Sequence, residues 1–462
     1  MTSKHFFLQD ILFLTALSAF FLLFRLGSGS LASWDEALYA SVAKEIFQSG
    51  DWLHLTLNGS QWADKPPLGI WATAFFYRLF GVHEFSARFF SALCGIGAVL
   101  VTYLIGGKLF NRWVGFLGAL VLLSSSQFIR YARFGMLDAP LVFFLSLSLY
   151  FFWRGYERNR YLIFSGISAG LAIMTKGFTG FLIFPITWLY CAFSGEFEIL
   201  LRSSYWIGLM LAAGVALPWN LYEMIDHGHL FVNEVVIKHL FRRTLTSLDG
   251  HKGNFYFYIR TLVNKYHPWV LIGIFSGPFF LFKAAKERIG GALYLAVWIF
   301  FIFAVITGVQ TKLPWYILPI YPALSLTVGY VLAKLFDENH GNFVRAAFIG
   351  VMVLHIQYSH IFDHDYSRNI KGIASVVRTG VPEGQWIYLY NYHETNAVTF
   401  YLDRGCWYLD TPQELTAAAK QAQRFYCLVL DRDLGAVQNL FSQLDLKVSG
   451  SFEDLKLVTK IS

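Results

Sequence analysis

Carboxylates and basic side chains recur beside the long apolar runs of this sequence. They are Asp35, Glu36, Asp64, Asp138, Lys65, Arg130, Arg133, Lys176, His239, Arg242, Arg243 and Lys312. A carboxylate can act as a general base toward an acceptor hydroxyl, and Lys and Arg side chains can hold a phosphate and stabilise it as it leaves. The set therefore suits a reaction in which a phosphate-linked donor is held at the edge of a lipid bilayer.

Most of these side chains also have a purely structural interpretation. Asp35 could be an acidic residue that favours the start of a helix, and Asp64 with Lys65 could be a surface ion pair. Arg130, Arg133, Lys176 and Lys312 could anchor helix ends at the interface, and His239 is more often an ordinary satisfied histidine than a metal ligand. We favour the functional interpretation because the residues fall on one predicted side of the membrane, as the following paragraphs argue.

The composition is that of a membrane protein. Of the 462 residues, 56% are hydrophobic and 15% are charged, and the mean hydropathy is +0.47. Soluble proteins average roughly 25% charged residues. The net charge of +7 comes from basic residues scattered through short connections, where they orient a membrane protein. We therefore expect a polytopic membrane protein that does not bind nucleic acid.

The apolar runs predict about eleven membrane-spanning helices, since each span needs about 20 mostly apolar residues. The predicted spans are 8–26, 86–107, 113–129, 136–153, 161–175, 178–194, 205–224, 268–284, 291–309, 314–335 and 343–362. We interpret the first run as a retained helix, because no small-residue cleavage site follows it.

Basic residues in the short connections predict the orientation of these spans. With Lys4 in the cytoplasm, the inside connections also carry Lys108, Arg112, Arg154, Arg158, Arg160, Arg202, Lys283, Lys286, Arg288, Lys334 and Arg345. Segments 27–85, 130–135, 175–177, 225–267 and 310–313 and everything after about 362 then lie outside, so the candidate residues gather on the outer side. Segments 35–47, 67–80 and 230–245 within the two long loops have the spacing of interfacial helices.

The chain changes character after residue 362, so we predict two domains, 1–362 and 363–462. In the second, 385–390, 406–409 and 425–430 have the pattern of short buried strands, and 412–423 and 434–444 that of amphipathic helices. The predicted fold is an all-α polytopic membrane domain with a small α/β domain outside. Cys406 and Cys427 could pair there, and no cysteine has the spacing of a metal site.

The polar motifs resemble those of a known family. The matching segments are Trp34-Asp35-Glu36-Ala37-Leu38-Tyr39-Ala40, Asp64-Lys65-Pro66-Pro67-Leu68, Arg133-Phe134-Gly135-Met136-Leu137-Asp138, Thr175-Lys176-Gly177 and Thr311-Lys312-Leu313-Pro314-Trp315-Tyr316. In this order they resemble the class C (GT-C) glycosyltransferases related to bacterial aminoarabinose transferase and protein O-mannosyltransferases. The resemblance covers roughly residues 8–335.

The resemblance implies a transfer reaction and roles for individual residues. A sugar would pass from an undecaprenyl-phosphate carrier to a lipid A or lipopolysaccharide, glycan or protein acceptor at the periplasmic face of the bacterial inner membrane. By resemblance, Asp35 is the base and Asp138 its acidic companion. Residues implied to bind the carrier phosphate or the sugar are Lys65, Asp64, Arg242, Lys176, Lys312, Tyr316, Glu36 and Arg133.

Two questions stay open at this point. A divalent metal could be held by Asp64 and His239, but no clean ligand set is visible. A non-catalytic lipid-handling protein is the main alternative to an enzyme. A secondary transporter is disfavoured, because such proteins carry charges near the bilayer midplane in broken helices and have inverted repeats, which we do not find here.

Overall fold

The computed structural model describes residues 2–247, 250–287, 290–359, 362, 365–392 and 395–461. Contacts within the chain divide it into two compact units. The first unit holds 1–26, 63–72 and 88–362, and the second holds 27–62, 73–87 and 363–462. The predicted two-domain boundary at residue 362 stays a prediction, because the tail clusters with parts of the first long loop.

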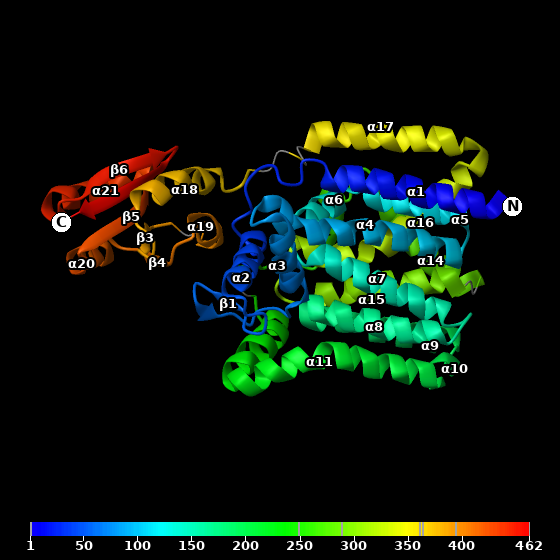
Figure 1. The fold of residues 1–462 in the computed structure, drawn as a ribbon. Coiled ribbons are helices and arrows are strands. Elements are labelled where there is room, and N and C mark those ends of the chain that lie inside the picture. Colours follow the sequence, from blue (N-terminus) through cyan, green and yellow to red (C-terminus); the bar gives the residue numbers. More distant parts are fainter. Residues whose placement is uncertain are drawn as a thin grey trace. The chain divides into compact units, whose positions relative to one another are not determined.

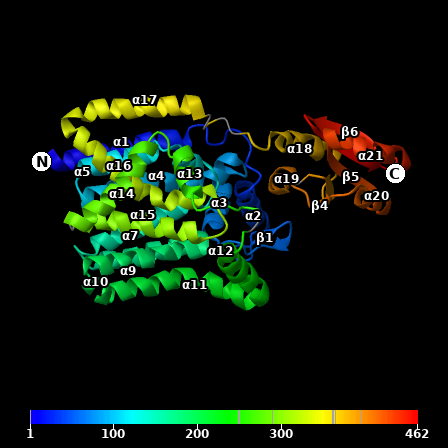
Figure 2. The ribbon, with the colours of Figure 1, turned by 180° about the vertical axis from the view of Figure 1, so that it is seen from behind.

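The first unit is a bundle of long helices. Figure 1 and the reverse view in Figure 2 show most of them lying side by side. The helices, with the shorter turns that join them, are α1 (Thr2–Leu23), α4 (Glu84–Leu109), α5 (Arg112–Leu123), α6 (Ser126–Arg133), α7 (Asp138–Arg154), α8 (Arg160–Lys176), η1 (Gly177–Leu182), α9 (Ile183–Ser194), α10 (Glu198–Leu201), α11 (Ser203–Phe231), η2 (Val232–Arg242), α12 (Arg243–Leu245), α13 (Phe257–Lys265), α14 (Val270–Glu287), α15 (Gly290–Gly308), η3 (Pro314–Ile320), α16 (Tyr321–Leu335), η4 (Glu338–His340) and α17 (Gly341–Ser359).

The chain is a multi-pass membrane protein. Within the described residues, five helical stretches are long and apolar enough to cross a membrane, and α5 with α6 makes a sixth candidate that bends by 66°. A helix lies at each of the eleven predicted spans, but several are short or broken. The count of eleven therefore stays a prediction, as do the cytoplasmic N-terminus and the periplasmic face.

Small residues let neighbouring helices of the first unit approach closely. A Cβ added at Gly166 of α8 would lie 1.9 Å from the carbonyl oxygen of Gly208 in α11. In a bilayer, helices associate by packing rather than by the hydrophobic effect, and small residues at the contact favour it. Glycine at both positions therefore sets the spacing of α8 and α11.

The second unit contains α2 (Asp35–Ser49), the hairpin β1 (Thr56–Leu57) and β2 (Ser60–Gln61), most of α3 (Leu68–Phe80), and the tail. The tail forms a five-stranded sheet in the order β4-β3-β5-β7-β6, in which β4, β3 and β5 are parallel and β7 and β6 are antiparallel. Its elements are α18 (Arg368–Gly380), β3 (Ile387–Tyr390), α19 (Thr395–Leu402), β4 (Cys406–Leu409), α20 (Pro412–Gln421), β5 (Arg424–Leu430), α21 (Asp431–Leu444), β6 (Lys447–Phe452) and β7 (Leu455–Ile461).

Alternation along the central strand β5 explains how this sheet is covered. Phe425, Cys427 and Val429 pack in one core with residues of α20 and α21. Alternate residues face the opposite side, since successive side chains of a strand point to opposite faces. The predicted α/β arrangement of the tail agrees with this structure. The two cysteines that could have paired, Cys406 and Cys427, are buried free thiols.

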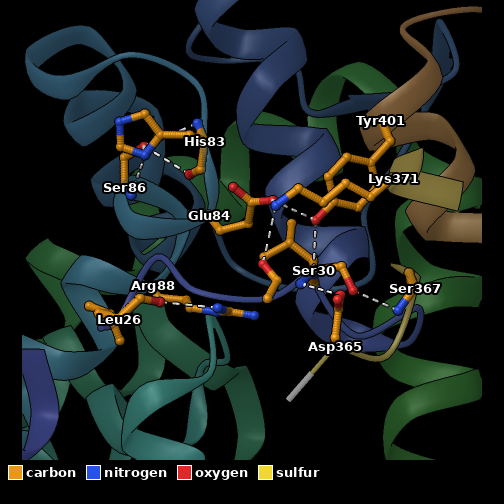
Figure 3. Close-up of polar contacts among 12 residues, drawn as sticks. Leu26, Ser30, His83, Glu84, Ser86, Arg88, Asp365, Ser367, Lys371 and Tyr401 are labelled. Carbon is orange, nitrogen blue, oxygen red and sulfur yellow. Dashed lines mark hydrogen bonds and ion pairs between the residues drawn. The ribbon is translucent and has the colours of Figure 1, made fainter. Parts of the chain in front are cut away.

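Within the second unit, hydrogen bonds and an ion pair join the first long loop to the tail (Figure 3). Glu84 lies 2.5 Å from the ammonium of Lys371 and accepts a hydrogen bond from Tyr401 at 3.0 Å. The backbone N–H groups of Ser30 and Ser367 donate to Asp365 and to the Ser30 hydroxyl, at 2.8 and 2.7 Å. The first loop and the tail therefore fold as one body.

Candidate functional site

Asp138 and Lys176 meet at the ends of two adjacent helices. Asp138 is the first residue of α7, and Lys176 is the last residue of α8, which packs along α7. The Lys176 Nζ lies 2.6 Å from the Asp138 Oδ1, and the two side chains are only 9% and 2% exposed. An acid at a helix start and a base at a helix end both complement the helix dipole. The sequence thus places a buried ion pair at one end of the bundle.

Tyr316 and Arg243 extend this cluster. The Lys176 Nζ lies 5.8 Å from the centre of the Tyr316 ring, in a cation–π contact, and Arg243 donates a hydrogen bond to the Tyr316 hydroxyl at 2.8 Å. The backbone N–H of Thr311 donates to the Arg243 carbonyl at 3.1 Å. The segment after α15 therefore holds Arg243 in place.

A second group of charges forms around Asp64. The Lys238 Nζ lies 3.5 Å from the Asp64 Oδ1 and 2.5 Å from the Glu234 carboxylate, and Lys65 donates to the Asp64 carbonyl at 3.0 Å. Burial lowers the pKa of Lys238, but the hydrogen bond to Glu234 and the charge of Asp64 outweigh it and leave the pKa raised. Lys238 is therefore a cation at neutral pH.

Two glycines bring the Asp64 segment to the helix ends that carry the buried ion pair. A Cβ added at Gly69 would lie 2.2 Å from Leu137, the residue before Asp138. Gly177, which follows Lys176, has φ +56°, a conformation that favours glycine, and its added Cβ would lie 3.7 Å from Pro66. The first unit thus gathers lysines, an arginine and carboxylates around one end of α7 and α8. Such a mixture can hold a phosphate beside an acid or base.

Asp35 and Glu36 lie in the second unit. Asp35 is the first residue of α2 and is partly exposed. Glu36 is fully buried, and its carboxylate accepts a hydrogen bond from the backbone N–H of Ala32 at 2.7 Å. Glu36 therefore holds the turn that leads into α2, whereas Asp35 is the carboxylate of the pair that solvent can reach.

Lys312 and Arg133 make contacts that stabilise helix ends. The Lys312 ammonium donates to the carbonyls of Ile306 and Thr307, at 2.9 and 2.5 Å, and to that of Val309. Arg133 donates to the carbonyls of Phe21 and Leu22, at 2.8 and 3.2 Å. Carbonyls in the last turn of a helix lack partners within the helix, so a cation there has a structural role. The predicted substrate contacts of both residues stay predictions.

Arg242 and His239 are the predicted site residues that remain. Arg242 has an exposed side chain, while its neighbour Arg243 makes the contact to Tyr316. The side chain of His239 lies outside the described residues. In the part of the chain that the structure describes, no group of three His, Cys, Asp or Glu residues is placed to hold a metal ion. The question of a divalent metal at Asp64 and His239 stays open.

The sequence interpretation did not single out Glu234 and Lys238, and it named Arg243 among the candidate basic residues but assigned the contact with the carrier phosphate to Arg242. Glu234 and Lys238 are four residues apart, a spacing that pairs opposite charges on a helix and could have drawn attention to them. They lie in η2, a π-helical segment that follows a break at Gly228. Such segments occur often at functional sites.

The sequence has known relatives. Residues 64–222 match the family model described as dolichyl-phosphate-mannose-protein mannosyltransferase. A protein of Aquifex aeolicus with no described function is 32% identical over 68% of this chain and 62% of its own length. An undecaprenyl phosphate-alpha-4-amino-4-deoxy-L-arabinose arabinosyl transferase of Pseudomonas fluorescens is 27% identical over 71% of this chain and 58% of its own length. The chain therefore spans less than two thirds of these relatives.

Solved structures share the fold. The crystal structure of ArnT from Cupriavidus metallidurans bound to undecaprenyl phosphate matches with a TM-score of 0.81 at 20% identity, covering 100% of this chain and 99% of the other. The oligosaccharyltransferase of Archaeoglobus fulgidus matches with a TM-score of 0.63 at 12% identity, covering 93% of this chain and 70% of the other. At these identities the likeness establishes the fold alone.

Proposed function

We propose that this chain, which belongs to the class C (GT-C) family of glycosyltransferases, moves a sugar from an undecaprenyl-phosphate carrier to an acceptor at the periplasmic face of the bacterial inner membrane. The acceptor would be a hydroxyl or phosphate group of lipid A or lipopolysaccharide, of another glycan, or of a protein. The observation that carries the proposal is the gathering of Lys176, Lys238 and Arg243 with Asp138 and Asp64 at one end of the helix bundle.

In the proposed reaction the acceptor oxygen attacks the anomeric carbon of the sugar. The bond between that carbon and the carrier phosphate oxygen breaks, and undecaprenyl phosphate leaves with the electron pair. Asp35 accepts the proton of the acceptor hydroxyl as general base. Asp35 is proposed for this role because its side chain is partly exposed, unlike the carboxylate of Glu36.

The basic residues of the first unit would bind the carrier phosphate. The hydrogen bonds to the phosphate would strengthen as negative charge develops on it during its departure. Their donors would be Lys65, Lys176, Lys238 and Arg243. Arg243 can offer a planar fork to two phosphate oxygens, and the lysines act as point charges. Asp138 would keep Lys176 oriented, because the two side chains are paired at 2.6 Å. Tyr316 would fix Arg243 in the same way.

The experiment is a transfer assay with the full chain in lipid nanodiscs. Synthetic undecaprenyl-phosphate sugars are the donors, and lipid A and lipopolysaccharide are the first acceptors. We expect Asp35→Asn to lower kcat by about 10²-fold or more, as for loss of a general base. Asp51→Asn is the matched control, because Asp51 is an exposed carboxylate that pairs with His54 at 2.7 Å on the surface of the same loop.

The alternative, a lipid-handling protein without catalysis, predicts a different result. Wild-type protein would bind the carrier, and neither an acceptor nor water would receive the sugar from any donor tested. Equal transfer rates for wild type and Asp35→Asn would instead support the glycosyltransferase activity and show that Asp35 is not the general base.

A further inference from the structure

A cavity of about 380 Å³ opens within the second unit. Its walls come from α2, from the turn of the β1–β2 hairpin, and from the tail around residues 384–386 and 399–405. The volume lies in the range of roughly 300–1,000 Å³ that is common for small-molecule sites. The reaction proposed above gives this cavity no role.

An exposed tryptophan forms one wall of the cavity. Trp386 is 44% exposed, and its ring packs against that of Trp407 at a tilt of 34°, with the ring centroids 5.2 Å apart. A Cβ added at Gly405 would lie 2.6 Å from the Trp386 ring, so glycine lets the indole lie close against the backbone there. The indole is therefore braced by Trp407 and Gly405 while part of its surface stays accessible.

Paired charges form the wall next to α2. The Lys44 ammonium lies 2.8 Å from the Asp403 carboxylate and donates to the Phe400 carbonyl at 2.9 Å. Gln48 donates to the Asp403 carboxylate at 3.1 Å. Because Lys44 is engaged in this way, the wall presents polar groups without a large excess of positive charge.

Arg404 contributes further polar groups to the cavity. Its guanidinium donates to the carbonyls of Asp403 and Val381, at 2.9 and 3.4 Å. Among the described residues, no acceptor pairs with its Nε, which is buried. Asn58 and Gln385 also line the cavity. Side-chain amides both donate and accept hydrogen bonds, so they can bind a hydroxyl group as donor or as acceptor.

The hairpin that carries Asn58 is fixed to α2. The Glu45 carboxylate accepts hydrogen bonds from the Thr56 hydroxyl and the Asn58 backbone N–H, both at 2.6 Å. Asn58 and Gly59 both have positive φ, the conformation of a tight two-residue hairpin turn. This wall of the cavity is therefore preorganised.

We propose that this cavity binds a saccharide portion of the acceptor. A sugar ring has an apolar face of C–H groups, which suits an indole, and a rim of hydroxyls, which suits amides, carboxylates and guanidinium groups. The polar walls disfavour an acyl chain, and the pairing of Lys44 with Asp403 disfavours a phosphate as the main ligand. The assignment of the saccharide to the acceptor rests on the proposed glycosyltransferase function; saccharide binding itself does not.

The test measures binding separately from transfer. The full chain in nanodiscs is titrated with the lipid-free oligosaccharide released from lipopolysaccharide by mild acid, and saturation-transfer NMR reports binding. We expect Trp386→Ala to weaken binding about tenfold, the equivalent of one aromatic contact, and Trp386→Phe to restore most of it. Tyr408→Ala is the matched control, because Tyr408 is an exposed aromatic residue of β4 that does not line the cavity.

The outcomes distinguish this inference from the proposed reaction. Hydrolysis of the donor by water should proceed at the wild-type rate in Trp386→Ala, since that reaction needs no saccharide acceptor. If Trp386→Ala does not fold, Gln48→Ala replaces it, with the same expected direction. Wild-type protein that fails to bind the oligosaccharide at roughly 10 mM, or variants that bind it as well as wild type, would overturn the inference. Absence of transfer together with specific binding would overturn only the proposed reaction.

Discussion

Lys176 closes a buried ion pair with Asp138 at the ends of α8 and α7, with 2.6 Å between the Nζ and the Oδ1. Removing one partner of such a pair leaves a buried charge and costs about 3–5 kcal/mol. We expect Lys176→Met to lower the thermal unfolding midpoint markedly and to abolish transfer. Lys108→Met is the control, because its partner is exposed Glu157 and surface pairs contribute about 0–1 kcal/mol.

A double substitution separates the structural role of this pair from its role in the reaction. Asp138→Asn combined with Lys176→Gln removes both charges together, so no uncompensated charge remains. We expect the free energy of unfolding to return to within about 1–2 kcal/mol of wild type, while transfer stays absent. Transfer near the wild-type rate in the double variant would mean that the pair serves folding only.

The neighbouring residues Arg242 and Arg243 should differ in their effect on donor binding. Arg243 donates to the Tyr316 hydroxyl at 2.8 Å, and the Arg242 side chain is exposed. We expect Arg243→Ala to raise the KM for the donor about tenfold or more, and Arg242→Ala to change it much less. Tyr316→Phe should share part of the effect of Arg243→Ala, which a double-mutant cycle on KM would measure. A larger effect at Arg242 would contradict this assignment.

The positions of candidate residues at the ends of apolar helices can be predicted from the sequence. Asp138 and Lys176 flank apolar runs of adjacent spans, so their meeting follows from the order of the helices. The choice between Arg242 and Arg243 does not follow from the sequence. They lie at the end of a π-helical segment, where the angle per residue departs from that of an α-helix, so helical periodicity cannot say which side chain faces Tyr316.

In the tail, buried strands could be predicted from the sequence and an exposed strand could not. Strands β3 and β5 are mostly buried and apolar, and the sequence indicated them. Strand β6 lies at the edge of the sheet with most of its residues exposed, so its polar sequence carried no strand signal. The contacts of Lys312 and Arg133 with backbone carbonyls could not be predicted, because they depend on the folded structure, and the substrate contacts of both residues stay predictions.

The ion pair between Lys44 and Asp403 should make the stability of the second unit depend on pH. Burial raises the pKa of Asp403, but the hydrogen bond from Lys44 and its charge outweigh burial and leave the pKa lowered. A carboxylate with a lowered pKa stabilises the fold above its unfolded pKa of about 3.9, and this stabilisation is lost as the pH falls through the folded value.

Asp403→Asn should therefore lower the unfolding midpoint at neutral pH, and the difference from wild type should shrink below about pH 4. Thermal unfolding of the full chain followed by tryptophan fluorescence measures both midpoints. Asp410→Asn provides the control, because Asp410 is an exposed carboxylate in the same unit. A difference between wild type and Asp403→Asn that does not change with pH would show that the charge of Asp403 does not stabilise the fold.

Lys312 offers a test of whether a basic residue beside a span binds substrate or completes a helix end. Its ammonium donates to carbonyls that include those of Ile306 and Thr307, and its side chain is 5% exposed. Hydrogen bonds to a charged group contribute about 1.5–3 kcal/mol each, so Lys312→Met, which removes several of them, should lower the free energy of unfolding by at least about that amount. We expect the KM for the donor to stay near its wild-type value in the protein that remains folded. A variant that unfolds like wild type but has a donor KM raised about tenfold would instead support the contact with the carrier that the family resemblance implies, because the loss would then lie in donor binding and not in the fold.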